Sequence, residues 1–208
     1  YAYAQLAKAE DVCHTDIVVS VPSGNFGNLT AGLIAKRMGL PIKRFIAANN
    51  SNDVVYEYLQ TGQYNPRKSV PTIANAMDVG NPSNFSRILD LYGKSYGAIA
   101  KDVVGAKYSD LEIGKILMDT FRREHYLLDP HGAVGYGALR DNLQDGEVGI
   151  CLETAHPAKF KEIVENIIGE DVDVPQRLLA LIHKPKKSIC MSADFNTFKE
   201  YLLSLKCH

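Results

Sequence analysis

Residues 17–32 read IVVSVPSGNFGNLTAG, and this stretch decides the fold class. The almost unbroken apolar run 17–21 is typical of a β-strand that is buried on both faces. Turn-forming residues 22–28 follow, and residues 29–38 then predict a helix that ends at Gly39. A strand that passes through a glycine turn directly into a helix indicates an α/β fold with a mainly parallel sheet.

The rest of the chain repeats this alternation of short apolar runs and amphipathic stretches. Residues 44–48 and 148–152 predict two further core strands. Ser109 and Glu112 fit a capping box at the start of one helix, and Pro157 suits the first turn of another. Three apolar stripes are expected to face the core: Ile113, Ile116, Leu117 and Phe121; Phe160, Ile163, Val164, Ile167 and Ile168; and Phe195, Phe198, Leu202 and Leu205.

Composition narrows the class of protein. The formal net charge of −1 over 208 residues gives no reason to expect a nucleic-acid or membrane partner, and no apolar run approaches the ~20 residues of a membrane span. The cysteines show no paired CxxC spacing, so we expect neither a metal site nor disulfides, and a cytoplasmic location. The chain opens without methionine in a helix-like pattern, which leads us to expect a missing N-terminal part.

The turn at residues 23–28, SGNFGN, is a candidate anion site. The first-turn amides of a helix lack partners within the helix, and its dipole favours negative charge there. Gly24 and Gly27 would permit dihedrals that a β-carbon forbids, so that amides converge on phosphate oxygens. The spacing matches neither GxGxxG nor the Walker pattern. From the residues alone, a phosphate site and a plain structural turn stay equally open.

The loop and four later blocks resemble threonine synthase, a family of pyridoxal-phosphate enzymes. The blocks are ANNSND at 48–53, NAMDVGNPSNF at 75–85, DPHGAVGY at 129–136 and ETAHPAKF at 153–160. The resemblance implies a fold-type-II architecture, with a cofactor-binding α/β domain at 1–170 and a helical extension at 171–208. It also implies the conversion of O-phospho-L-homoserine and water to L-threonine and phosphate.

The resemblance also assigns roles to individual residues. Gly24, Asn25, Phe26, Gly27 and Asn28 would bind the phosphate of pyridoxal phosphate, chiefly through their amides. No segment matches the family's Schiff-base lysine, which precedes the glycine loop, so this chain alone is expected to be inactive. The missing N-terminal part of the same enzyme would supply that lysine.

Other candidates lie farther along the chain. Thr154 would face the pyridine nitrogen, and the alternative is that Thr154 or His156 merely caps the helix at Pro157. Ser83, Asn84 and Arg87 are candidate substrate ligands, and a solvated helix face would also explain Arg87. His131 and His156 could line the active site or serve structure alone. Lys159 and Lys161 lie off the apolar stripe and are expected at the surface.

Two alternative functions stay open at this point. A threonine-synthase-like phospho-lyase would share the cofactor site and release a keto acid from a phosphorylated substrate. A non-catalytic module that binds a phosphate ligand would need the loop alone.

Overall fold

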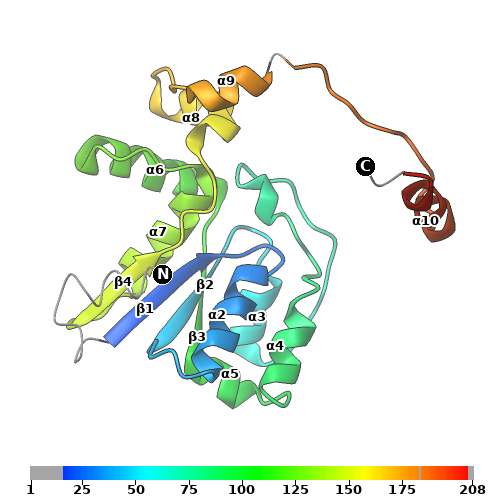
Figure 1. Cartoon of the computed structure of the whole chain (residues 1–208). Helices are drawn as coiled ribbons and strands as arrows, with labels where there is room; N and C mark the ends of the chain where they lie inside the picture. Colours follow the sequence, from blue (N-terminus) through cyan, green and yellow to red (C-terminus); the bar gives the residue numbers. More distant parts are fainter. Residues whose placement is uncertain (1–15, 183, 206–208) are drawn as a thin grey trace. The chain divides into compact units, whose positions relative to one another are not determined.

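The computed structural model describes residues 16–182 and 184–205 (Figure 1). The helix-like pattern at residues 1–9 lies outside the described residues. The chain divides into two compact units, the first ending at Asp173 and the second beginning at Val174. The first unit contains the sheet and both of the cores described below.

The first unit alternates strands and helices, as the sequence predicts. In chain order its elements are β1 (Asp16–Pro22), α2 (Gly27–Arg37), β2 (Arg44–Asn49), α3 (Val54–Thr61), η2 (Asn75–Met77), α4 (Phe85–Leu91), α5 (Tyr96–Asp102), β3 (Val103–Lys107), α6 (Asp110–Glu124), α7 (Pro130–Asn142), β4 (Glu147–Cys151), η3 (Pro157–Phe160) and α8 (Lys161–Ile168).

The four strands form one parallel sheet in the order β3-β2-β1-β4. Val19 lies opposite Phe45 on β2, and Val18 lies opposite Gly149 on β4. The α/β class and the three predicted strands are confirmed. The strand β3 pairs with β2 and was not predicted from the sequence. It is short and has a glycine, Gly105, at its centre.

Helices cover both faces of the sheet, which explains the unbroken apolar run of β1 (Figure 1). Ile17 and Val19 belong to the core beneath α2, α3, α4 and α5. Val18, between them, points to the opposite core, which α6, α7 and α8 complete. Because neighbouring residues of a strand point to opposite faces, a strand with two cores has no polar face.

Several helix ends are as predicted. Ser109 accepts from the Glu112 amide while the Glu112 carboxylate accepts from the Ser109 amide, so the capping box is confirmed. The helix predicted from Pro157 begins as the 3₁₀ turn η3 and continues as α8. It ends at Gly169, whose φ of 74° places it in the left-handed region that suits a C-terminal glycine.

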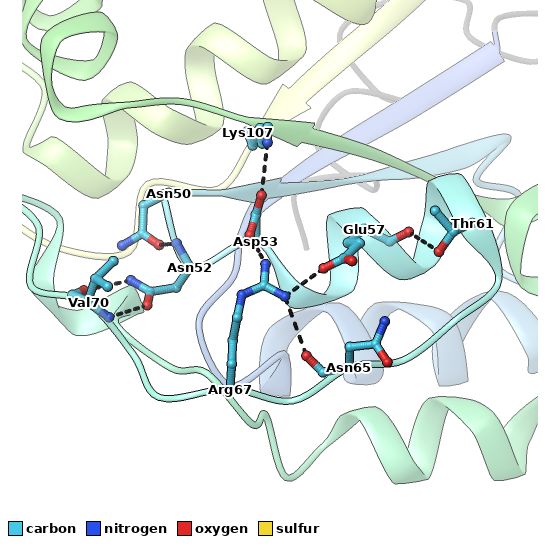
Figure 2. Close-up of polar contacts among 9 residues, drawn as sticks. All are labelled: Asn50, Asn52, Asp53, Glu57, Thr61, Asn65, Arg67, Val70 and Lys107. Carbon is cyan, nitrogen blue, oxygen red and sulfur yellow. Dashed lines mark hydrogen bonds and ion pairs between the residues drawn. The ribbon is translucent and has the colours of Figure 1, made fainter.

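A long connection, residues 62–84, is mostly irregular and is fastened at several points (Figure 2). Arg67 bonds the carboxylates of Asp53 and Glu57, and Lys107 bonds Asp53 at 2.9 Å. Asn52 exchanges two hydrogen bonds with the backbone of Val70, at 2.8 and 2.9 Å. These bonds hold the connection against the ends of β2 and β3. The turn η2, which lies within this connection, packs beside the loop between β1 and α2.

The second unit contains α9 (Gln176–Ile182) and α10 (Phe195–Ser204). The final helix predicted from Phe195, Phe198, Leu202 and Leu205 is present as α10, and its apolar stripe is not buried within the second unit. That this stripe faces a core stays a prediction. Phe195 is 71% exposed and Phe198 is 47% exposed, and α10 has no buried residue. Periodicity shows that one helix face is apolar, but it does not supply a covering surface. Among the described helices, none is long and apolar enough to cross a membrane.

Candidate functional site

The loop between β1 and α2 lies at the carboxyl edge of the sheet, where open α/β folds bind ligands. Its unusual backbone residue is Phe26, with φ 62° and ψ 19°, immediately before α2. The expectation that Gly24 and Gly27 supply such dihedrals is wrong, because neither has a positive φ. Phe26 tolerates the left-handed conformation because its ring is anchored in the core, 3% exposed.

Gly24 serves close packing instead. A β-carbon on Gly24 would lie 2.7 Å from Met77 Cα and 3.0 Å from the Ala76 carbonyl oxygen. At Gly27 the nearest atom would be Asn84 Nδ2 at 3.7 Å, an ordinary contact. Only Gly24 of the two is therefore sterically required, because the backbone of η2 packs directly on the loop.

The loop amides are available to a ligand. Within residues 16–182 and 184–205, no acceptor receives a hydrogen bond from the amides of residues 24–28. Phe26 carries no side-chain cap for α2, so the first-turn amides keep their donor capacity. Phe26 is buried and Gly24 partly buried, whereas Asn25, Gly27 and Asn28 are exposed, so water or a bound anion can accept from these amides.

These amides surround a cavity of about 230 Å³. The six residues predicted to bind the cofactor come together there: Gly24, Asn25, Phe26, Gly27, Asn28 and Thr154. Pro22, Ser23, Ala76, Met77 and His131 complete the lining. Loops after β1 and β4, the η2 turn and the start of α7 thus meet at one point, because parallel strands place their carboxyl ends at one edge.

The predicted substrate residues divide into two groups. Ser83 and Asn84 contact the loop, since Asn25 Oδ1 accepts from the Ser83 amide at 2.6 Å and Asn84 Nδ2 donates to the Asn25 carbonyl at 2.9 Å. Arg87 donates to Asn84 Oδ1 at 3.1 Å but lines a different groove, between α2 and α4, together with Thr30 and Asp90. Arg87 therefore lies apart from the loop cavity.

The residues after β4 include the cap of the following 3₁₀ turn, η3. His156 Nδ1 accepts from the Ala158 amide at 3.1 Å, so His156 caps η3 and does not line the cavity. Thr154 lines the cavity and makes no hydrogen bond through its hydroxyl to the described part of the chain. Lys159 is exposed, and Lys161 bonds Glu165 and the Val172 carbonyl.

His131 is buried, 3% exposed, in the wall of the cavity. Its Nε2 accepts from the Ala76 amide at 3.1 Å, so Nε2 carries no proton. Its Nδ1–H therefore donates to Asp129 Oδ1, at 2.6 Å. Burial would raise the pKa of Asp129, but hydrogen bonds from His131 and Glu153 outweigh it, and the pKa lies below its ordinary value.

The sequence analysis missed Glu153 as a chemically unusual group. Its carboxyl packs on Gly132 at the start of α7, where an added β-carbon would meet both oxygens within 2.4 Å. Asp129 Oδ2 is buried and lacks a hydrogen-bond partner among the described residues. Burial first, and then the hydrogen bond and charge of Asp129, raise the pKa of Glu153 from 4.5 to about 8.

The chain is similar to known proteins over most of its length. Residues 2–152 match the family model described as pyridoxal-phosphate dependent enzyme. This chain belongs to that family. Residues 132–202 also match the family model for the C-terminal part of threonine synthase.

Individual relatives agree with the family assignment. Threonine synthase from Serratia marcescens is 43% identical over 205 residues, covering 99% of this chain and 47% of the relative. The crystal structure of the Escherichia coli threonine synthase superposes with a TM-score of 0.85, at 42% identity, covering 98% of this chain and 47% of that one. A pyridoxal-phosphate-bound threonine synthase from Brucella melitensis gives 0.83 at 27% identity, with 97% and 48% covered.

The resemblance to threonine synthase predicted from the sequence is confirmed. The chain spans about half the length of the curated relatives that it matches. The parallel sheet flanked by helices is likewise shared with these solved structures. The individual roles of Thr154, Ser83 and the loop residues stay predictions.

Proposed function

We propose that this chain supplies the cofactor-phosphate site of an enzyme that converts O-phospho-L-homoserine and water to L-threonine and phosphate. The observation that carries the proposal is the set of loop amides at residues 24–28, which lack acceptors and surround the cavity of about 230 Å³. A phosphate dianion suits such donors, because several amides without acceptors and the positive end of a helix dipole favour an anion.

Each part of the cavity has a proposed task. The amides of Gly24 to Asn28 hold the cofactor phosphate, and the start of α2 adds its dipole. Thr154, across the cavity, presents its hydroxyl to the ring nitrogen, where a neutral partner leaves that nitrogen unprotonated. Pyridoxal phosphate, when bound, supplies the electron sink for the substrate carbanion.

Ser83 and Asn84 are the proposed substrate ligands beside the same loop. Both bond Asn25, one through the Asn25 side chain and the other through its carbonyl, so they fix the orientation of the loop. Arg87 reaches this set only through Asn84, and its own groove lies between α2 and α4. We therefore place Ser83 and Asn84 nearer to the substrate than Arg87.

A cytoplasmic location stays a prediction from the cysteine pattern.

The binding proposal is tested on the 208-residue chain with inorganic phosphate and pyridoxal phosphate in separate NMR titrations. We expect the amide signals of residues 24–28 to shift with both ligands, without the visible absorption of a lysine imine. Thr154→Val should weaken binding of pyridoxal phosphate and leave inorganic phosphate unaffected. Arg87→Ala is the matched control, and binding of phosphate that depends on Arg87 would refute the loop assignment.

The reaction is tested on an enzyme that joins this chain to the portion of a threonine synthase relative that it does not cover. Incubation with O-phospho-L-homoserine should release phosphate and L-threonine in equal amounts. Release of phosphate with a keto acid and without threonine would identify a phospho-lyase instead. Absence of any phosphate release, in an enzyme that binds the cofactor, would favour a binding module.

A further inference from the structure

The inference concerns His131, which contacts the loop cavity from a separate element. His131 lies in the first turn of α7, 55 residues beyond Ala76, and accepts the Ala76 amide on Nε2 at 3.1 Å. The acceptor role requires the tautomer with the proton on Nδ1. That Nδ1–H donates a 2.6 Å hydrogen bond to Oδ1 of Asp129, the N-cap of α7. Asp129 is fully buried, so water does not compete for this bond.

The partner of His131 bears directly on the phosphate loop. Ala76 lies in η2, whose next residue, Met77, places its Cα where a β-carbon on Gly24 would approach to 2.7 Å. The residues that flank η2 are held separately: Asp78 Oδ1 accepts from Asn50 and Asn52 at 2.8 and 2.9 Å, and Asn50 also donates to the Ala74 carbonyl at 3.3 Å. The His131 bond holds Ala76, the middle residue of η2, from α7.

We propose that His131 is a positioning residue that keeps the backbone of η2 pressed on Gly24, so that the loop amides stay converged on a phosphate. His131 does this as a neutral acceptor whose tautomer Asp129 sets, and it transfers no proton. Removing the acceptor breaks the part-buried bond from the Ala76 amide and lets η2 move away from the loop. The inference rests on the proposed phosphate site and adds a residue that controls its geometry.

A loosened η2 lowers the population of chains whose loop amides are converged. Apparent affinity falls by the same factor as the competent population. The net loss of one part-buried amide hydrogen bond corresponds to a change of up to roughly tenfold in such an equilibrium. We therefore expect the dissociation constant for inorganic phosphate to rise about tenfold when position 131 carries no acceptor.

Three variants of the 208-residue chain test this. His131→Leu removes the acceptor, whereas His131→Gln keeps an acceptor in its Oε1 atom. His156→Leu is the matched control, because it also removes a ring nitrogen that accepts a backbone amide at 3.1 Å, from Ala158, outside the cavity. We expect tenfold weaker phosphate binding for His131→Leu, at most about a threefold change for His131→Gln, and none for His156→Leu.

Two further readouts separate positioning from general stability. Hydrogen exchange at residues 75–77 should accelerate in His131→Leu and return toward the wild-type rate in His131→Gln. Nitrogen NMR of the His131 ring should show the Nδ1–H tautomer in the wild-type chain. The Nε2–H tautomer would overturn the proposal even if His131→Leu fails to fold, and so would unchanged phosphate affinity in a folded His131→Leu chain.

The outcomes also distinguish this inference from the proposed function. If the wild-type chain binds neither inorganic phosphate nor pyridoxal phosphate, the loop assignment fails. The tautomer and the exchange rate at Ala76 then still report whether His131 holds η2. If the wild-type chain binds phosphate and His131→Leu binds it equally well, the loop assignment stands and the role of His131 is refuted.

Discussion

Replacement of Gly24 by alanine tests the close contact between the loop and η2 most directly. The new β-carbon would lie 2.7 Å from Met77 Cα, 3.0 Å from the Ala76 oxygen and 3.2 Å from the Met77 carbonyl carbon. All three are backbone atoms, so no side chain can rotate away to make room. Either η2 or the loop must shift, and overpacking by one methyl group in a well-packed region costs about 1–3 kcal/mol.

The expected magnitude can be checked by urea unfolding of the 208-residue chain together with phosphate titration. We expect Gly24→Ala to lower the free energy of unfolding by about 1–3 kcal/mol at an unchanged urea dependence, and to weaken phosphate binding. Gly114→Ala is the matched control, because Gly114 lies inside α6 with no atom within 4 Å of an added β-carbon. It should stabilise the chain by about 0.5–1 kcal/mol. Equal stability of the Gly24→Ala and wild-type chains would refute the packing argument.

Three other predictions concern Glu153, Ser109 and Phe26. The wild-type free energy of unfolding should fall as pH rises from 4.5 to about 8, because folded Glu153 holds a proton that the unfolded chain releases. Glu153→Gln should remove that part of the slope, and an unchanged pH profile would contradict the assignment, with Glu162→Gln as control. Ser109→Ala should lower the free energy of unfolding by about 1 kcal/mol in thermal unfolding, through loss of the cap of α6; no change would argue against the cap. Phe26→Gly should be more stable than Phe26→Ala by about 1 kcal/mol, because glycine accepts a φ of 62°, and the reverse order would refute the left-handed conformation.

Much of the fold could be predicted from the sequence because it follows from local patterns. The apolar run 17–21 predicted a strand with two buried faces, and Ser109 with Glu112 predicted a capped helix. Both predictions depend on residues within one element and are confirmed. What covers the stripe of α10 does not follow from the sequence, because periodicity shows an apolar face and does not specify its covering surface. The short strand β3 lacked a long apolar run and was missed.

The candidate site divides in the same way between local and distant contributions. The loop itself could be predicted, because a strand, a glycine turn and a helix start lie together in the sequence. The role of Gly24 could not, since a glycine needed for close approach looks the same as one needed for a positive φ. His131 and Glu153 were hidden for a related reason, because their unusual environments come from Ala76 and Asp129 on other elements.

The position of strain within the loop has a consequence for how the site forms. If a glycine carried the left-handed turn, the loop could adopt it in an otherwise unfolded segment at little cost. Phe26 carries it instead, and a non-glycine residue reaches that region only at about 1–2 kcal/mol. Burial of the Phe26 ring between β1 and its covering helices offsets this cost. The loop therefore acquires this shape only when the core beneath α2 has formed, which ties the geometry of the amides to the folding of the whole unit.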